Sequence, residues 1–310
     1  MKTTRQWPPQ VGLAIALALL MLGLTLARPN FLTLGNLVNL VRQISINGIL
    51  AVGVTYVLLT GGVDLSLGSM VALTGVIAAS FAHPGQYGQL VPVLMGVLAG
   101  ALCGAANGLM VTRGRMAPFV VTLGMMTSAR GLALLLSGGR PVSNLTPAFT
   151  RIGSGDFAGL PAPTWILLAV ALGSHVFLRN MRIGRHVYAV GGNENAARAS
   201  GVNVRGVKMA AYTICGAMAG LAGVVLASRI TTGQPNAGIG YELDAIAAVV
   251  IGGTSLSGGV GGVSGTILGA LLIGVINNGL DLLNVSSYYQ QVIKGLIIVG
   301  AVWLDRSRKS

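Results

Sequence analysis

Charged residues are scarce in this chain. Asp, Glu, Lys and Arg make up 9% of its 310 residues and aromatic residues 5%, whereas 53% are hydrophobic. Soluble domains are usually about one quarter charged. A soluble chain this apolar would lack the polar surface to cover its core, whereas a bilayer accepts apolar side chains outward. The composition therefore predicts an all-α integral membrane protein, with residues 1–310 forming one polytopic transmembrane domain.

The motifs for nucleotide and metal chemistry are missing as well. The sequence contains no Gly-Lys pair, which the phosphate-binding loop of ATPases requires. It also lacks a His-Glu-x-x-His helix, and its three histidines, His83, His175 and His186, are scattered. We therefore expect no metal site, no cofactor and no ATP hydrolysis by this chain itself.

Cysteine is nearly absent, and the basic residues are not arranged for nucleic acid. Cys103 and Cys215 both fall inside apolar runs, where they are expected to pack as small hydrophobic residues. The net charge is +13, but Lys and Arg lie between apolar runs and are not interleaved with aromatics. We expect no nucleic-acid partner, and we attribute the charge to orientation in the membrane.

What the chain does contain is ten apolar runs. A bilayer needs about 20 residues, and each run is long enough, or nearly so, to cross it, except that residues 245–253 are short unless 241–244 belong to that run. The first run follows Lys2 and Arg5 and exceeds the core of a signal peptide, about 7–15 residues, so we expect an uncleaved span. The predicted spans are residues 11–27, 44–60, 67–82, 90–111, 119–136, 165–178, 207–227, 245–253, 263–280 and 288–304.

The distribution of basic residues predicts the orientation of these spans. Short cytoplasmic loops carry excess Lys and Arg. Both chain ends, the turn with Arg113 and Arg115, and residues 179–208 are rich in these residues and fall on one side. The opposite loops, residues 29–40, 138–163, 229–244 and 281–287, are mixed in charge. We therefore expect both termini in the cytoplasm.

Glycine is abundant, with 47 residues, and its spacing predicts close helix packing. Gly96, Gly100, Gly104 and Gly108 recur every fourth residue along one helix face, and the pairs 216/220 and 265/269 repeat this spacing. Residues 61–66 and 252–257 also form a weak internal sequence repeat, and each segment joins two apolar runs.

One motif of an enzyme is present. Residues 262–265, Gly-Val-Ser-Gly, resemble the nucleophile turn of intramembrane serine proteases, with His175 as the possible base. In that family the His follows the Ser, the reverse of the order here. Because this string arises easily in a glycine-rich chain, we favour packing over catalysis.

A short polar segment on the cytoplasmic side is more specific. Asn193 is predicted to cap a short helix, Glu194 suits its positive end, and Gly201 is expected to close it in a left-handed conformation. Such a segment is either a solvated linker or a helix that a partner protein grips. Its candidate residues are Gly192, Asn193, Glu194, Ala196, Ala197, Ser200 and Gly201.

Several strings in order resemble the permease subunits of bacterial monosaccharide ABC importers, most closely the ribose permeases. They are LTGGVDLSLGS at residues 59–69, GGNE at 191–194, SGVNV at 200–204, GYELDAIAAVV at 240–250, GGTSL at 252–256, NNGL at 277–280 and VSSYYQ at 285–290. One departure is GGVGG at residues 258–262, where ribose permeases have a basic Gly-Gly-Lys-Gly-Arg stretch.

This resemblance implies the pore subunit of an ATP-driven importer in the bacterial inner membrane, carrying ribose or a related pentose or hexose. It further implies a second permease copy, a cytoplasmic ATPase subunit that binds the ATP, and a periplasmic sugar-binding protein. The segment from Asn193 to Gly201 would then be the coupling helix that contacts the ATPase.

Transport of an uncharged sugar calls for hydrogen-bonding groups in the spans. For the Asn residues a helix-to-helix hydrogen bond and a role in the pathway are equally compatible with the sequence, and Asp64 is also placed to cap a span. Arg130, in the middle of a span, is expected to face the bundle interior. The pathway candidates are Asn47, Asp64, Asn107, Arg130, Asn277 and Asn278.

Arg140, Arg151 and Arg229 are candidates for docking the binding protein, because they fall on the side opposite the predicted coupling helix.

Two other classes of protein stay open. A secondary transporter would act without an ATPase but needs coupling carboxylates at membrane depth, and the acids here fall at predicted span ends or in loops. The intramembrane protease is the other alternative.

Overall fold

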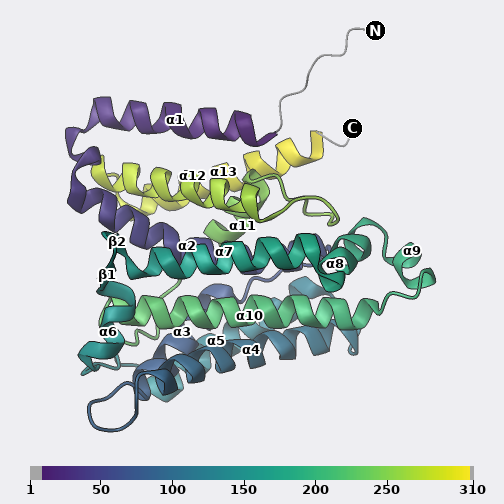
Figure 1. Ribbon diagram of the computed structural model, residues 1–310, viewed down its shortest axis with the longest axis horizontal. Helices are drawn as coiled ribbons and strands as arrows, with labels where there is room; N and C mark the ends of the chain where they lie inside the picture. The colour runs from purple at the N-terminus through teal and green to yellow at the C-terminus, as the bar shows by residue number, and fades with distance from the viewer. Residues whose placement is uncertain (1–8, 308–310) are drawn as a thin grey trace.

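The computed structural model describes residues 9–307, and its long helices run side by side in one bundle (Figure 1). In chain order the elements are α1 (Pro9–Ala27), η1 (Pro29–Leu32), α2 (Leu34–Leu59), α3 (Leu67–Ser80), α4 (Leu90–Thr112), α5 (Pro118–Ser137), α6 (Pro147–Ser154), β1 (Asp156–Phe157), β2 (Leu160–Pro161), α7 (Ala162–Asn180), α8 (Arg182–Gly192), α9 (Glu194–Ala199), α10 (Val204–Arg229), α11 (Tyr241–Ile251), α12 (Val263–Leu282) and α13 (Ser287–Ser307).

Each predicted apolar run lies on one of these helices, which confirms the all-α membrane fold. Within residues 9–307, seven helices are long and apolar enough to cross a bilayer. Two others are short, because α3 has 14 residues and α11 has 11. The predicted basic residues at the chain ends, Lys2, Arg5, Arg308 and Lys309, lie outside the described residues.

Helix α2 starts at Leu34, well before the apolar run that begins at Ile44, so part of the expected loop 29–40 is helical. Its first turns carry polar side chains that find partners in other elements. Asn36 exchanges two hydrogen bonds with Asn278 on α12, at 2.8 and 3.0 Å. Arg42 forms an ion pair with Asp156 on β1 at 3.0 Å. These contacts let the helix extend past its apolar part.

The predicted glycine stripe is the contact between α4 and α10, which confirms its structural role. A Cβ atom at Gly100 would lie 2.3 Å from the carbonyl oxygen of Gly216, and one at Gly104 would lie 2.2 Å from that of Tyr212. In return, a Cβ at Gly216 would lie 2.2 Å from the oxygen of Gly100. Only glycine permits this approach, which maximises van der Waals contact where lipid provides no hydrophobic drive for association.

The chain is non-helical between α10 and α11, and Gly233, Pro235 and Gly238 of this segment are buried. Gly238 lies against Gly68 on the first turn of α3, where an added Cβ would come within 2.1 Å of the Gly238 oxygen. The guanidinium of Arg130 on α5 donates to the carbonyl oxygens of Pro235 and Ala237, at 2.7 and 2.8 Å. Irregular backbone within a membrane protein needs such internal partners, so Arg130 faces the interior as predicted.

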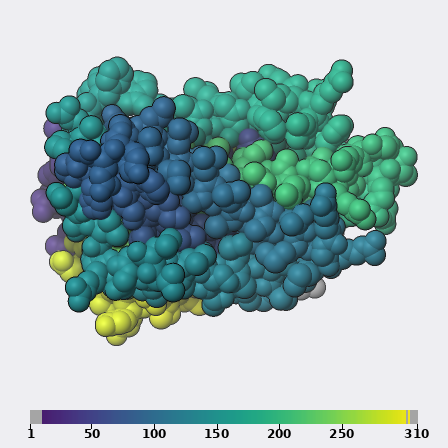
Figure 2. Space-filling model, turned by 90° about the horizontal axis from the view of Figure 1, so that it is seen from below, coloured from purple at the N-terminus to yellow at the C-terminus, as the bar shows by residue number. Residues whose placement is uncertain are grey.

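The short elements mark the two ends of the bundle. Figure 1 places α6 with the β1–β2 hairpin at one end, and α8 and α9 at the other, where α13 also ends. Figure 2 shows the face made by α4 and α5, in blue to blue-green, with part of α13 in yellow at one edge. We call these the hairpin end and the α9 end.

Candidate functional site

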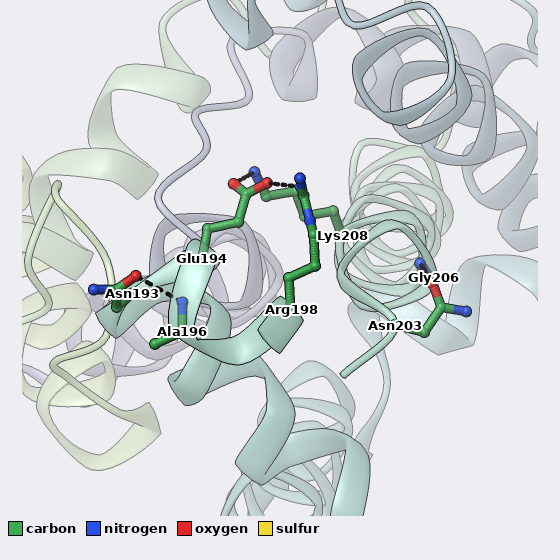
Figure 3. Close-up of polar contacts among 7 residues, drawn as sticks. All are labelled: Asn193, Glu194, Ala196, Arg198, Asn203, Gly206 and Lys208. Carbon is green, nitrogen blue, oxygen red and sulfur yellow. Dashed lines mark hydrogen bonds and ion pairs between the residues drawn. The ribbon is translucent and has the colours of Figure 1, made fainter. Parts of the chain in front are cut away.

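The segment predicted to contact a partner is a capped helix at the α9 end (Figure 3). The side-chain Oδ1 of Asn193 accepts a hydrogen bond from the backbone N–H of Ala196 at 3.0 Å, as an N-cap does. Gly201 follows the last turn with φ of +81°, a left-handed conformation that glycine adopts without strain. The local structure expected for Asn193, Glu194 and Gly201 is confirmed.

Glu194 ties this short helix to α10. Its carboxylate accepts hydrogen bonds from Arg198 and from Lys208 on α10, both at 2.7 Å (Figure 3). The hydrogen bond from Lys208 is the main cause that holds the pKa of Glu194 below its ordinary value, and Arg198 adds to it. The carboxylate is therefore ionised at neutral pH, and α9 cannot move away from α10 without breaking the pair between Glu194 and Lys208.

The candidate residues of α9 divide between two faces. Ala197 is buried, at 6% exposure, and packs in a cluster with Val204 and Val207. Gly192, Asn193, Ala196, Ser200 and Gly201 are exposed. Ala197 therefore anchors the helix, whereas the exposed face of small residues is the part that a partner could contact.

Helix α8, which joins α7 to this segment, was not predicted from the sequence. Its signal was present, because Gly184, Val187 and Val190 are three residues apart and are buried on one face. The last turn of α8 is held tightly, since a Cβ at Gly191 would lie 1.8 Å from the carbonyl oxygen of Leu59.

The glycine-rich loop that departs from the ribose permeases lies against this turn. The backbone N–H of Gly259 donates to the Leu59 oxygen at 3.0 Å, and a Cβ at Gly258 would lie 3.0 Å from the Cα of Gly191. Val260, at the position of the Lys, is 62% exposed. The substituted loop therefore belongs to the same surface as the capped helix, and it offers an apolar group there instead of a cation.

The polar candidates within the bundle bridge helices in separate places. Asn107 on α4 donates to the hydroxyl of Ser66 at 3.1 Å, and Ser66 donates to the carboxylate of Asp64. Asp64 also accepts from the backbone N–H of Ser66, but helix α3 starts only at Leu67, so it does not cap that helix in the way expected. Asp64 and Asn107 are both fully buried.

A second polar cluster joins α11, α12 and α13. Asn277 on α12 donates to Asp244 on α11 at 3.1 Å, and Lys294 on α13 donates to the same carboxylate oxygen at 2.9 Å. Lys294 was not among the sequence candidates, although a cation within an apolar run is itself a signal for a buried partner. Asn278, the adjacent residue on α12, contacts Asn36 on α2 instead.

These candidates therefore do not form a single lining. Asn47 on α2 is buried, and its side-chain oxygen has no hydrogen-bond partner within the described part of the chain. Thr55 pairs with Thr266 on α12 at 2.8 Å, which is a helix-to-helix bond. The hydrogen bonds of Asn107, Asn277 and Asn278 are of the same kind, so these side chains connect helices of one chain.

The arginines proposed for docking differ in accessibility. Arg140 follows α5, Arg151 lies on α6, and both are exposed. Arg229, the last residue of α10, is half-buried. All three belong to elements that meet at the hairpin end, opposite α9 (Figure 1).

An open groove runs between α11 and α13. Its volume is about 460 Å³, and polar side chains on its walls include Glu242, Gln290, Gln291 and Lys294. Beside it, α13 exposes a stripe of large residues, among them Tyr288, Val292 and Leu296, at 83, 61 and 68%. Polar groups of this kind are costly against lipid, so the groove requires cover by protein or water.

The residues of the protease motif do come close to each other. Ser264 and His175 line one cavity of about 330 Å³. The side-chain amide of Gln10, however, donates to the Ser264 hydroxyl at 3.4 Å, and within residues 9–307 no hydrogen bond joins Ser264 to His175. The pair that would activate a serine nucleophile is therefore not formed.

Comparison with known proteins agrees with a transport role. Residues 36–302 match the family described as branched-chain amino acid transport system, permease component. The chain is 45% identical to the ribose import permease protein of Escherichia coli K12 over 310 residues, covering 99% of this chain and 96% of that one. It is also 45% identical to the ribose import permease protein of Bacillus subtilis, covering 97% and 94%.

A third relative is the D-allose transport system permease protein of Escherichia coli K12, 39% identical over 276 residues, with 89% of this chain and 85% of that one covered. No solved structure matches the chain. The match over most of its length, together with the helical bundle, establishes that this chain belongs to the family of transport-system permease components, as a membrane-embedded transport subunit.

Proposed function

We propose that this chain forms the pore of an ATP-driven importer for ribose or a closely related monosaccharide in the bacterial inner membrane. The observation that carries the proposal is 45% identity to ribose import permeases over nearly the whole chain. In this proposal a separate ATPase subunit binds and hydrolyses ATP, a periplasmic protein delivers the sugar, and the chain needs no cofactor of its own.

The capped helix supports the assignment of α9 as the coupling element. It presents small exposed residues, Ala196 and Ala199, which a cleft on the ATPase can enclose. Its pairing with Lys208 through Glu194 gives a rigid connection to α10, the helix that packs on α4. Movement of the ATPase would therefore be transmitted to the bundle along α10. This orientation puts the α9 end and both termini in the cytoplasm.

The groove between α11 and α13 supports a homodimer. A second copy seated on the exposed stripe of α13 would cover the polar groove and leave the sugar pathway between the two chains. Hydroxyls of an uncharged sugar suit Gln290, Gln291 and Glu242, which offer several weak hydrogen bonds. In this arrangement the buried bridges of Asn107, Asn277 and Asn278 hold the helices in place, and Arg130 supports the irregular segment before α11.

The test is sugar uptake in vesicles that contain the chain, its ATPase and its binding protein. ATP-dependent uptake of ribose is expected, and Ala196→Trp should abolish uptake while leaving the chain folded. Asn195→Gln, a conservative change on the same exposed surface, is the matched control. Uptake that proceeds without nucleotide would instead support a secondary transporter, and loss of function on Ser264→Ala without loss of folding would support the protease.

A further inference from the structure

A second cavity lies at the α9 end, between the turn that joins α4 to α5 and the start of α10. It has a volume of about 460 Å³. Figure 2 shows the blue-green turn and the green start of α10 at the same end of the molecule. Its charged lining consists of Arg115, Arg198, Arg205, Lys208 and Glu194.

The charges of this cavity do not balance. Four cationic side chains face a single carboxylate, and that carboxylate is already shared by Arg198 and Lys208. Arg115 and Arg205 are exposed and add positive charge on opposite walls. An anionic ligand that enters the cavity would meet cations from the α4–α5 turn, α9 and α10 together.

The backbone also fixes the position of one of these cations. Arg115 has φ of +53°, a left-handed conformation that is uncommon for residues other than glycine. The turn is held by the backbone N–H of Met116, which donates to the carbonyl oxygen of Met110 at 3.3 Å. Arg115, which lines the cavity, therefore occupies a backbone conformation that glycine would adopt more easily.

The remaining walls are apolar, and they continue onto the outer surface of the bundle. Val111, Met116 and Pro118 line the cavity. Directly beyond the turn, Phe119 and Val120 are each 57% exposed, and Leu109 on α4 is 43% exposed. A ligand of this site would therefore have a negative head and a hydrophobic body.

We infer that this cavity binds the phosphate of an anionic phospholipid, with the acyl chains lying along the exposed apolar surface of α4 and α5. The phosphate accepts hydrogen bonds from Arg115 and Arg205, which are not paired with Glu194. Glu194 keeps its ion pairs with Arg198 and Lys208. Basic cavities at the cytoplasmic ends of membrane helices have the chemistry to hold such headgroups. The inference requires the chain to lie in a membrane, but it does not depend on which solute is transported.

The experiment measures lipid binding to the purified full-length chain in detergent. The probes are phosphatidylglycerol, phosphatidylcholine and inorganic phosphate, and bound lipid is counted by native mass spectrometry. Phosphatidylglycerol should bind best. Arg115→Gly removes the whole side chain with its charge and suits the left-handed backbone, so folding is retained. Each of Arg115→Gly and Arg205→Gln should lower the affinity about fivefold, and the double variant about 25-fold.

Arg113→Gln is the matched control, because Arg113 is exposed on the same turn but does not line the cavity. At about 0.15 M salt its effect should stay below about twofold. Equal binding of phosphatidylglycerol and phosphatidylcholine, or an equal loss in the control, would overturn the inference. So would inorganic phosphate that competes fully, which indicates a free-phosphate site, or displacement of the lipid by the ATPase subunit, which indicates a protein contact.

Discussion

Lys294 on α13 donates a hydrogen bond to the carboxylate of Asp244 on α11 at 2.9 Å. The Asp244 side chain is 5% exposed and that of Lys294 is 29% exposed. This pair connects α13 to α11, and Asn277 on α12 donates to the same carboxylate. It neutralises the Asp244 carboxylate inside the bundle, so Asp244 is not a free acid of the kind that a proton-coupled or sodium-coupled carrier would use.

Breaking this pair from one side should be costly. Lys294→Met leaves Asp244 buried without its cation, and we expect the chain to lose about 3 kcal/mol of stability. The measurement is thermal unfolding in detergent. The double variant Lys294→Met with Asp244→Asn should regain part of the loss, because no charge then stays buried. A double variant as unstable as the sum of the two single ones would contradict the pairing.

The glycine contact between α4 and α10 gives a steric prediction. Gly100→Ala would place a Cβ 2.3 Å from the oxygen of Gly216, so the helices must move apart. We expect a loss of about 2 kcal/mol. Gly131→Ala on α5 is the matched control, because no atom lies within 4 Å of its Cβ position. That variant should be neutral or more stable by up to about 1 kcal/mol, and similar losses at both sites would refute the argument.

The reciprocal amide pair Asn36–Asn278 predicts coupling between two distant positions. Asn278→Leu leaves the side-chain oxygen of Asn36 without its donor, although the Asn36 amide still donates to the carbonyl oxygen of Phe31, so stability should fall by about 1–2 kcal/mol. Asn36→Leu combined with Asn278→Leu should cost less than the sum of the single changes. If Asn278 also lines the pathway, uptake should fall further than stability explains while ATPase docking stays intact. Strict additivity of the two changes would exclude the pair.

Glu194 predicts a dependence on pH at the α9 end. Because the pKa of Glu194 is lowered in the folded chain, its pairing stabilises α9 fully above the ordinary Glu pKa of about 4.3 and is lost as pH falls through the lowered value. The hydrogen-exchange protection of residues 194–199, measured relative to the intrinsic exchange rate at each pH, should therefore fall at acid pH. In Glu194→Gln the exchange should already be fast at neutral pH. An unchanged exchange profile in this variant would show that α9 is held by Ala197 packing alone.

The exposed arginines at the hairpin end give a prediction about docking. Changing Arg140 and Arg151 together to Gln should lower the stimulation of sugar uptake by the binding protein about tenfold at low salt. The loss should be smaller at about 0.15 M salt, because salt screens the attraction between opposite charges on the two proteins. Arg229→Gln should contribute less, since that side chain is half-buried. Arg113→Gln, at the opposite end, is the control. Stimulation that is independent of both charge and salt would remove docking through these residues.

That this protein lies in a lipid bilayer could be predicted from the sequence. Few charges and ten apolar runs require a bilayer, and each run lies on a helix because backbone groups in lipid must pair within the segment. The cap at Asn193 and the left-handed Gly201 were equally predictable, since both depend on neighbours in the chain. The four-residue spacing of Gly96, Gly100 and Gly104 also predicted close packing, because residues four apart lie on the same face of a helix.

Other features depend on residues far apart in the chain. Sequence alone left Asn277 and Asn278 open between the pathway and helix bridging, and only the fold supplies Asp244 and Asn36 as their partners. The fold also places Ala197 on the buried face of α9 and brings Lys294 to Asp244. Local sequence fixes how a segment folds, because its hydrogen bonds close within a few residues. Which side chains meet across the bundle is decided by helix packing, because a polar group in a membrane protein takes its partner from whichever helix lies beside it.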